Sequence, residues 1–358
     1  MTFVLGRSVT PGPTAALGHF LATDGSRGAS VALDLDRPHV GLVVGKRGSG
    51  KSYTLGVLAE ELAATDGVAG VVVDPMGAFE GLAEAPGATV VDGPTVTAEA
   101  LSPEGWCRLL GLDPQRGPGS LLWRVAAGTT TLAEMRTVVD AAGVSSEVRR
   151  AVRNHLDLAA TWGVFDADGL RPTDLVRDGV TVLDVSTVPA RARAAIVAAV
   201  ADGLYDLAQR SAAIPLPWLL IDEAHVLTDS VATRALRTLL TRGRQPGVSL
   251  VLATQRPSAL PDVAVSQADL TIAHRLTAGP DVDALARTNP GYLDGDLADR
   301  LPDGVGRALV VDDETESAVT VRVRERSTRH DGGTPRVSER RPPDRAADGV
   351  PTPGRSRP

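Results

Sequence analysis

The sequence of 358 residues contains a single cysteine, Cys107. One cysteine cannot form an intrachain disulfide, and it excludes a metal cluster held by cysteines. Apolar runs are short, and none approaches the roughly 20 residues that cross a bilayer. The first ten residues also lack the apolar region of a secretory signal. These absences predict a cytoplasmic protein without a membrane segment.

Lysine and aromatic residues are scarce. Lys46 and Lys51 are the only two lysines, so almost every other positive charge is an arginine. Phe, Trp and Tyr make up 3% of the chain, which does not favour a surface that stacks single-stranded bases. The net charge is −7. A nucleic acid would therefore have to be bound by a local basic surface.

Short Val, Leu and Ile runs alternate with helical patterns along most of the chain. Runs of this length are typical of parallel strands covered by helices on both faces. The pattern predicts an α/β fold with a doubly wound, mainly parallel sheet. The predicted strands are His39–Val44, Gly70–Val73, Val180–Leu183, Trp218–Ile221, Ser249–Ala253, Arg307–Val311 and Val319–Val323, and the predicted helices include Ser52–Ala64, Arg191–Gln209 and Val231–Arg242.

The same patterns divide the chain into segments. We expect a short β segment at 1–38, a core formed by 39–78 and 179–325, and an insertion at 79–178. The insertion is predicted to be helical, because Thr131 and Glu134 have capping-box spacing. Val148, Val152, Leu156 and Ala159 also recur along one helix face. The last segment, 326–358, has eight Arg, four acidic residues and six Pro without apolar periodicity, so we predict disorder there.

A phosphate-binding loop follows the first apolar strand of the core. Residues 45–52 read Gly-Lys-Arg-Gly-Ser-Gly-Lys-Ser, the G-x-x-x-x-G-K-S pattern between a strand and a helix. Glycines let backbone N–H groups turn toward phosphates, and the helix N-terminus adds partial positive charge. We expect Lys51 to meet the β- and γ-phosphates and Ser52 to bind Mg²⁺. The predicted nucleotide-binding residues are Gly45, Lys46, Arg47, Gly48, Ser49, Gly50, Lys51, Ser52 and Tyr53.

The nucleotide itself is predicted to be ATP. Ras-type GTPases read guanine through an Asn/Thr-Lys-x-Asp motif, and no lysine follows Lys51. The signature Leu-Ser-Gly-Gly-Gln of ABC-type ATPases is also absent.

Two adjacent carboxylates end a later apolar strand. Trp218–Ile221 runs directly into Asp222 and Glu223, and strand alternation points the two side chains in different directions. We expect Asp222 to hold Mg²⁺ and Glu223 to orient and polarise the attacking water. The simpler alternative is a surface Asp-Glu pair that caps the next helix.

Polar residues around the next strand complete the predicted catalytic set. Gln255 follows Ser249–Ala253, at the edge where α/β proteins bind ligands. It would sense the γ-phosphate or position water; otherwise it is a loop amide bonded to backbone. Before this strand, Arg242 and Arg244 offer guanidinium groups that would reach into a neighbouring subunit.

Together these residues resemble the HerA/FtsK division of P-loop ATPases, and HerA most of all. The resemblance covers about 40–74 and 180–276. It is carried by Gly45–Ser52, Asp74-Pro75-x-Gly77, Leu183-Asp184-Val185-Ser186, Ile221-Asp222-Glu223-Ala224-His225, Gly243-Arg244-Gln-Pro-Gly247, Ala253-Thr254-Gln255-Arg256-Pro257 and Ser266-Gln267-Ala268-Asp269.

The resemblance implies a RecA-like core, a homo-oligomeric ring of about six subunits and translocation of double-stranded DNA in DNA processing or repair beside a NurA-type nuclease. It also implies Gln255 as the polar sensor and Arg244, with Arg242 as runner-up, as the finger in trans. Two departures are visible. Only 44 residues precede Gly45, where HerA-like proteins usually carry a β-barrel, and Ala78 replaces a common acidic residue. Asp74 is therefore given a supporting role.

The residues that would contact DNA are the least defined. Two groups of arginines, one in the insertion and one after the acidic motif, would line a pore or form an ordinary solvated face. They are Arg149, Arg150 and Arg153, and Arg234 and Arg237. His225 resembles the last residue of a helicase Asp-Glu-Ala-His box, although a local polar contact explains it equally well.

Two other functions remain open at this point. One is an ATP-dependent switch or motor that moves a protein partner in secretion or mobile-element assembly, without direct DNA translocation. The other is a nucleotide-binding scaffold with slow hydrolysis, which Glu223 disfavours because that residue supplies a carboxylate for water activation.

Overall fold

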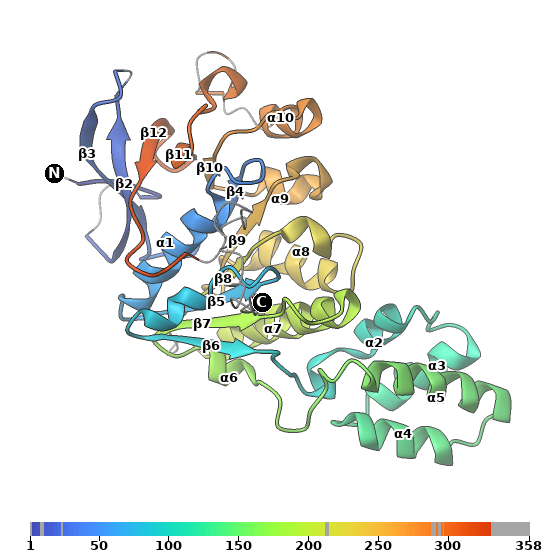
Figure 1. Cartoon of the computed structure of the whole chain (residues 1–358). Coiled ribbons are helices and arrows are strands. Elements are labelled where there is room, and N and C mark those ends of the chain that lie inside the picture. Colours follow the sequence, from blue (N-terminus) through green and yellow to red (C-terminus); the bar gives the residue numbers. More distant parts are fainter. Residues whose placement is uncertain are drawn as a thin grey trace, which may run out of the picture.

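Twelve strands form one continuous sheet in the computed structural model (Figure 1), which describes residues 2–7, 11–22, 24–211, 215–287, 291–292, 295 and 297–330. The order across the sheet is β1-β3-β2-β12-β11-β10-β4-β9-β8-β5-β7-β6. The strands are β1 (Thr2–Leu5), β2 (Thr14–Leu21), β3 (Arg27–Asp34), β4 (Val40–Val44), β5 (Val68–Asp74), β6 (Ala88–Asp92), β7 (Gly179–Asp184), β8 (Leu216–Ile221), β9 (Ser249–Thr254), β10 (Leu270–Ala273), β11 (Arg307–Asp312) and β12 (Ser317–Val323).

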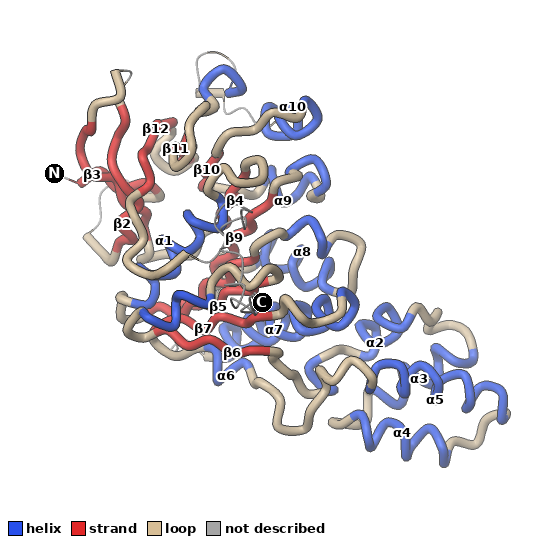
Figure 2. Tube along the Cα trace, viewed as in Figure 1, coloured by secondary structure: helices blue, strands red, loops and turns tan. Residues whose placement is uncertain are grey.

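Helices alternate with these strands (Figure 2). The α-helices are α1 (Lys51–Ala63), α2 (Pro103–Leu110), α3 (Gly117–Ala126), α4 (Leu132–Ala141), α5 (Ser146–Ala160), α6 (Pro172–Leu175), α7 (Ala190–Arg210), α8 (Ala232–Arg242), α9 (Asp262–Ser266) and α10 (Gly279–Ala286). Short 3₁₀ helices are η1 (Glu80–Glu84), η2 (Ala98–Ala100), η3 (Ala224–Leu227), η4 (Pro257–Ala259) and η5 (Leu297–Arg300). None of the described helices is long and apolar enough to cross a membrane.

The predicted mainly parallel sheet is confirmed. Seven neighbouring strands, from β10 through β4, β9, β8, β5 and β7 to β6, run parallel. The prediction of central parallel strands at 307–311 and 319–323 is wrong, because β11 and β12 pair antiparallel with each other and β11 with β10. Four residues join β11 to β12, and so short a connection permits only an antiparallel pair.

Apolar cores cover both faces of the parallel strands. Val40, Leu42 and Val44 of β4 pack into one core together with α7 and α8, and Val43 packs into the other together with α1. Successive side chains of a strand point to opposite faces, so a wholly apolar β4 fills both cores. The sheet is thereby held between two helical layers, as the apolar runs predicted.

The predicted insertion at 79–178 begins with core structure. Its residues 88–92 form β6, which pairs with β7 at the edge of the sheet, so this part of the prediction is corrected. The four helices α2 to α5 then form a separate lobe (Figure 1). The predicted capping box is present, because Thr131 and Glu134 exchange both hydrogen bonds at the start of α4. Val152, Leu156 and Ala159 are buried along α5, and Val148 is half-buried.

The two ends of the described chain also join the sheet. The segment at 1–38 supplies β1, β2 and β3, and β2 pairs with β12. Ordered structure continues past the predicted boundary at residue 325. Residues 326–330 lie against α1, where Thr328 is buried and bonds to Glu60. Most of the predicted disordered tail, 331–358, lies outside the described residues.

Candidate functional site

The phosphate-binding loop connects the end of β4 to the start of α1. Gly48 and Gly50 adopt φ of 74° and 119°, values that favour glycine because it has no side chain to clash. At Gly45, an added Cβ would lie 2.4 Å from Oγ of Ser49 and 2.7 Å from Cβ of His274. The loop backbone therefore needs glycine at these positions, and Gly45 and Gly50 are the two glycines of the motif.

Lys51 lies in the first turn of α1 and is 5% exposed. Its Nζ donates a hydrogen bond of 3.3 Å to the carbonyl oxygen of Lys46, across the loop. Burial lowers the pKa of Lys51, while the carboxylates of Glu223 and Asp222 act in the opposite direction. The loop thus holds a poorly hydrated ammonium group, which favours an anionic ligand.

The loop and the acidic motif meet although 170 residues separate them. Oγ of Ser52 donates a hydrogen bond of 2.6 Å to Oδ2 of Asp222. Asp222 is 1% exposed, and burial raises the pKa of its carboxyl, which the bond from Ser52 opposes. A hydroxyl and a carboxylate are hard oxygen donors of the kind that Mg²⁺ prefers. The residues present therefore fit the metal that the motifs imply.

Glu223 follows Asp222 with a left-handed backbone, φ 48°, which is uncommon outside glycine. Its N–H donates to Oδ1 of Asp222 at 2.8 Å, and this bond stabilises the turn. The side chain lines the same cavity as Lys51 and Ser52. Its buried Oε2 accepts no hydrogen bond from the described residues. A strained backbone that presents a carboxylate to a cavity is typical of functional sites.

His225 makes local polar contacts, which was one of the two interpretations of this residue. Its Nδ1 lies 3.2 Å from Oγ1 of Thr254 and 3.3 Å from Oε2 of Glu223. Burial, Arg256 and Lys51 lower the pKa of His225. A neutral imidazole next to Glu223 leaves that carboxylate's charge uncompensated on this side.

Gln255 lies between the two motifs. It follows β9, which pairs with β4 on one side and with β8 on the other. The three strands are parallel, so the loops after them meet at one sheet edge. Gln255 is half-buried there.

Arg244 and Arg242 are not brought to this edge. Arg244 precedes β9 and forms an ion pair with Asp269, which also bonds to His39 ahead of β4. Both arginines therefore lie at the edge where the parallel strands begin, opposite the phosphate-binding loop. Within one chain, Arg244 cannot reach a nucleotide bound at Lys51.

Asp74 has the supporting position expected of it. It is 1% exposed and accepts hydrogen bonds from the N–H groups of Met76 and Phe79, at 3.0 and 2.9 Å. These bonds fix the loop after β5, so Met76 and Ala78 line the cavity.

Sequence reasoning missed His274, which lies directly behind the loop. Nε2 of His274 and Oγ1 of Thr54 are 2.9 Å apart, and Nδ1 lies 2.9 Å from the carbonyl oxygen of Arg307. Burial lowers the pKa of His274 to about 4, so the imidazole is neutral and links α1 to β11. A lone histidine after a four-residue strand gives no signal of this role.

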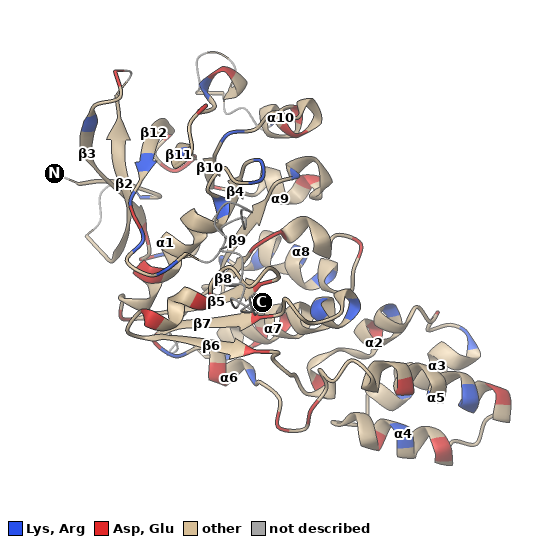
Figure 3. Cartoon of the chain, in the orientation of Figure 1, with Lys and Arg blue, Asp and Glu red and all other residues tan. Residues whose placement is uncertain are grey.

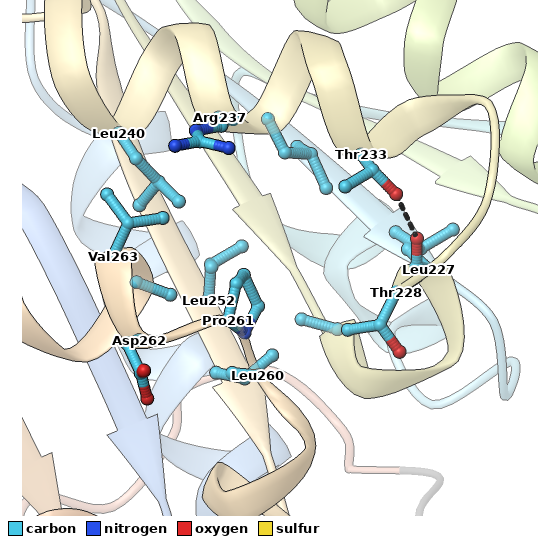
Figure 4. A pocket seen from close by; sticks show the side chains of 13 residues that line it. Leu227, Thr228, Thr233, Arg237, Leu240, Leu252, Leu260, Pro261, Asp262 and Val263 are labelled. Atoms are coloured by element: carbon cyan, nitrogen blue, oxygen red, sulfur yellow. Dashed lines mark hydrogen bonds between the residues drawn. The ribbon is translucent and has the colours of Figure 1, made fainter.

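The cavity at the loop has a volume of about 670 Å³ and includes Arg47, Gly50, Lys51 and Glu223 in its lining. A second cavity of about 300 Å³ lies between α8 and α9 (Figure 4). Its lining is mainly apolar, with Leu236, Leu252 and Leu260, and includes none of residues 45–52. A triphosphate needs cations and N–H donors, so the first cavity is the candidate site.

The chain is similar to known proteins in sequence and in fold. Residues 15–159 match the family described as "Helicase HerA, central domain". VirB4 of Thermoanaerobacter pseudethanolicus superposes with a TM-score of 0.66 at 16% identity, covering 89% of this chain and 98% of that one. The bacterial conjugative coupling protein TrwBΔN70, in complex with sulphate, gives 0.59 at 15% identity, with 81% and 86% covered. No curated protein matches the chain by sequence.

The matched family region runs from β2 through the phosphate-binding loop to α5. The two solved structures share the RecA-like fold over most of the chain. The family match confirms that the chain resembles the P-loop ATPase motors of the HerA/FtsK type.

Proposed function

We propose that the chain is an ATP-hydrolysing DNA translocase of the HerA type that acts as a homo-oligomeric ring, a hexamer, in DNA processing or repair. The observation that carries this proposal is the hydrogen bond of 2.6 Å between Ser52 and Asp222. It joins the phosphate-binding loop to the acidic motif at one cavity, which Lys51 and Glu223 also line.

The roles of the residues follow from their positions. ATP would bind with its triphosphate on N–H groups of the phosphate-binding loop and Lys51 at the β- and γ-phosphates. Ser52 and Asp222 would hold Mg²⁺, which neutralises charge on the β- and γ-phosphates when bound. Glu223 would accept a hydrogen bond from water and orient it toward the γ-phosphate. Gln255, between the two motifs, would sense whether that phosphate is present.

Contact with DNA rests on fewer observations. Arg153 is paired with Asp140 and Asp157, and Arg234 with Glu104. Acidic and basic residues alternate over the helical lobe (Figure 3), so these arginines form the solvated face weighed above. Arg150 and Arg237 are exposed, and no carboxylate of the described residues lies within ion-pair distance of either. We propose these two for contact with the DNA backbone.

The experiment that tests the function measures ATP hydrolysis with and without linear duplex DNA at low salt. We expect duplex DNA to raise the hydrolysis rate, and the rise to shrink as salt is added, because phosphate contacts release counterions. An ATPase indifferent to every nucleic acid would overturn DNA translocation. If that ATPase were stimulated by a protein partner instead, the switch or motor acting on proteins would take its place.

Replacing Arg244 by alanine tests the ring. The opposite-edge position of Arg244 predicts that it acts only on a neighbour's nucleotide, so hydrolysis should fall by about a thousandfold while ATP affinity stays within threefold. The measurement combines ATP titration, turnover and mass in ATP. Arg210→Ala is the matched control and should retain most of the rate, because Arg210 is an exposed arginine that also precedes a parallel strand, β8, and pairs with Asp206. A loss of ATP affinity in Arg244→Ala would contradict a role in trans.

A further inference from the structure

The nucleotide cavity has a second wall that comes from the far end of the described chain. Residues 322–325 and His330 line it together with the phosphate-binding loop. We call residues 322–330 the C-terminal wall. The volume of about 670 Å³ lies within the range of roughly 300–1,000 Å³ that takes ligands of drug size. The cavity therefore extends beyond what the loop alone would form.

The C-terminal wall is fixed to α1 through a buried carboxylate. Glu60 accepts hydrogen bonds from the N–H and Oγ1 of Thr328, at 2.9 and 2.7 Å, and from Nη1 of Arg324 at 2.7 Å. Nη2 of Arg324 donates to Glu61 at 2.7 Å. These bonds hold the pKa of Glu60 down to about 2 although burial acts against them. The wall is thus held on α1 by contacts within the chain.

Two glycines let this wall approach the core. A Cβ added at Gly56 of α1 would lie 2.6 Å from Cζ of Arg326, and one at Gly81 would lie 2.2 Å from the carbonyl oxygen of Arg329. Real Cβ atoms do not make such contacts. The close fit indicates that the wall has one defined position on α1.

An aromatic pair lies where the phosphate-binding loop ends and the wall begins. Tyr53 follows Ser52 directly, and its ring centroid is 5.3 Å from that of His330, at an interplanar angle of 81°. The hydroxyl of Tyr53 accepts a hydrogen bond of 2.7 Å from the N–H of Arg326. Both rings line the cavity, and His330 is exposed toward solvent. A flat ring at this place can stack with a nucleobase.

We propose that the C-terminal wall receives the nucleoside half of the bound nucleotide, and that the base lies against the ring of His330. This inference rests on the proposed binding of the triphosphate at residues 45–53. It divides the cavity into a phosphate side, with Lys51 and Ser52, and a nucleoside side, with Tyr53 and His330. The nucleoside side sets affinity for ATP over a bare triphosphate.

The test compares the dissociation constants of ATP and inorganic tripolyphosphate, both with Mg²⁺. Wild type should bind ATP more tightly than tripolyphosphate. His330→Ala should weaken ATP binding by about tenfold, as the loss of one stacking contact predicts, and should leave tripolyphosphate binding unchanged. His330→Phe should restore most of the affinity for ATP, because a phenyl ring stacks without the hydrogen-bonding nitrogen atoms of histidine. His155→Ala, in the helical lobe, is the matched control and should alter neither constant.

The outcomes separate this inference from the proposed function. If ATP and tripolyphosphate bind equally well to wild type, or if His330→Ala leaves their ratio unchanged, the nucleoside assignment is wrong. If His330→Ala weakens both ligands equally, or if His330→Phe fails to restore ATP binding, His330 acts on the phosphate side or through the fold, and the assignment is again wrong. A Lys51→Ala variant that still binds both ligands would instead overturn binding at the phosphate loop.

Discussion

Replacing Glu223 by glutamine should lower the ATP turnover rate by about a hundredfold to ten-thousandfold and leave ATP affinity nearly unchanged. Glutamine keeps the size of the side chain but cannot accept a proton from water, and removal of a general base costs this much. Asp222 and Ser52, which would hold the metal, remain bonded to each other. Single-turnover hydrolysis and ATP retention on the protein measure the two effects separately.

Glu316→Gln is the matched control for this variant. Glu316 also has a left-handed backbone, φ 49°, and lies in the exposed turn before β12. Its replacement removes one negative charge at a left-handed position, as Glu223→Gln does, without touching the cavity. Turnover should stay within twofold of wild type. If the two variants lose turnover equally, the effect of Glu223→Gln comes from the strained backbone and its role toward water is wrong.

Replacing Lys51 by alanine should weaken ATP binding by at least about 30-fold and abolish measurable hydrolysis. The side chain is buried beside two carboxylates. Without the lysine cation, nothing from this side chain offsets the negative charge of these carboxylates or of the incoming triphosphate. Truncating one partner of a buried charge pair costs at least about 2 kcal/mol. Titration with a fluorescent ATP analogue measures the affinity.

The only other lysine gives the control. Lys46 lies in the same loop, but the contacts are made by its backbone. Its N–H donates to the carbonyl oxygen of Arg275, and its carbonyl oxygen accepts from Nζ of Lys51. Lys46→Ala should therefore retain ATP affinity within about threefold. Equal losses in the two variants would show that net charge in the loop matters more than the position of Lys51.

The phosphate side of this site could be predicted from the sequence because its residues belong to short contiguous motifs. Residues 45–52 and the Asp222-Glu223 pair each follow an apolar strand, and parallel strands bring the loops after them to one edge. The pairing of β9 with both β4 and β8 then places Gln255 between them. No contact with a distant segment had to be known for these positions.

The nucleoside side depends on contacts that no local pattern reveals. Residues 326–330 have the polar, arginine-rich composition of a disordered tail, and disorder was predicted for them. The segment is ordered instead, because the buried carboxylate of Glu60 accepts several hydrogen bonds from it. The position of His274 behind the loop likewise follows from the pairing of β10 with β4. Long-range contacts decide both features. Composition therefore predicted disorder for residues 326–330 wrongly and gave no prediction for the position of His274.

The structure of the chain with Mg²⁺ and a non-hydrolysable ATP analogue is the most direct measurement. We expect the triphosphate on N–H groups of the phosphate-binding loop, the metal at Oγ of Ser52 and near the carboxylate of Asp222, and Glu223 facing the γ-phosphate. A triphosphate bound elsewhere, or a metal that Asp222 does not approach, would contradict the proposal that the two motifs act on one nucleotide.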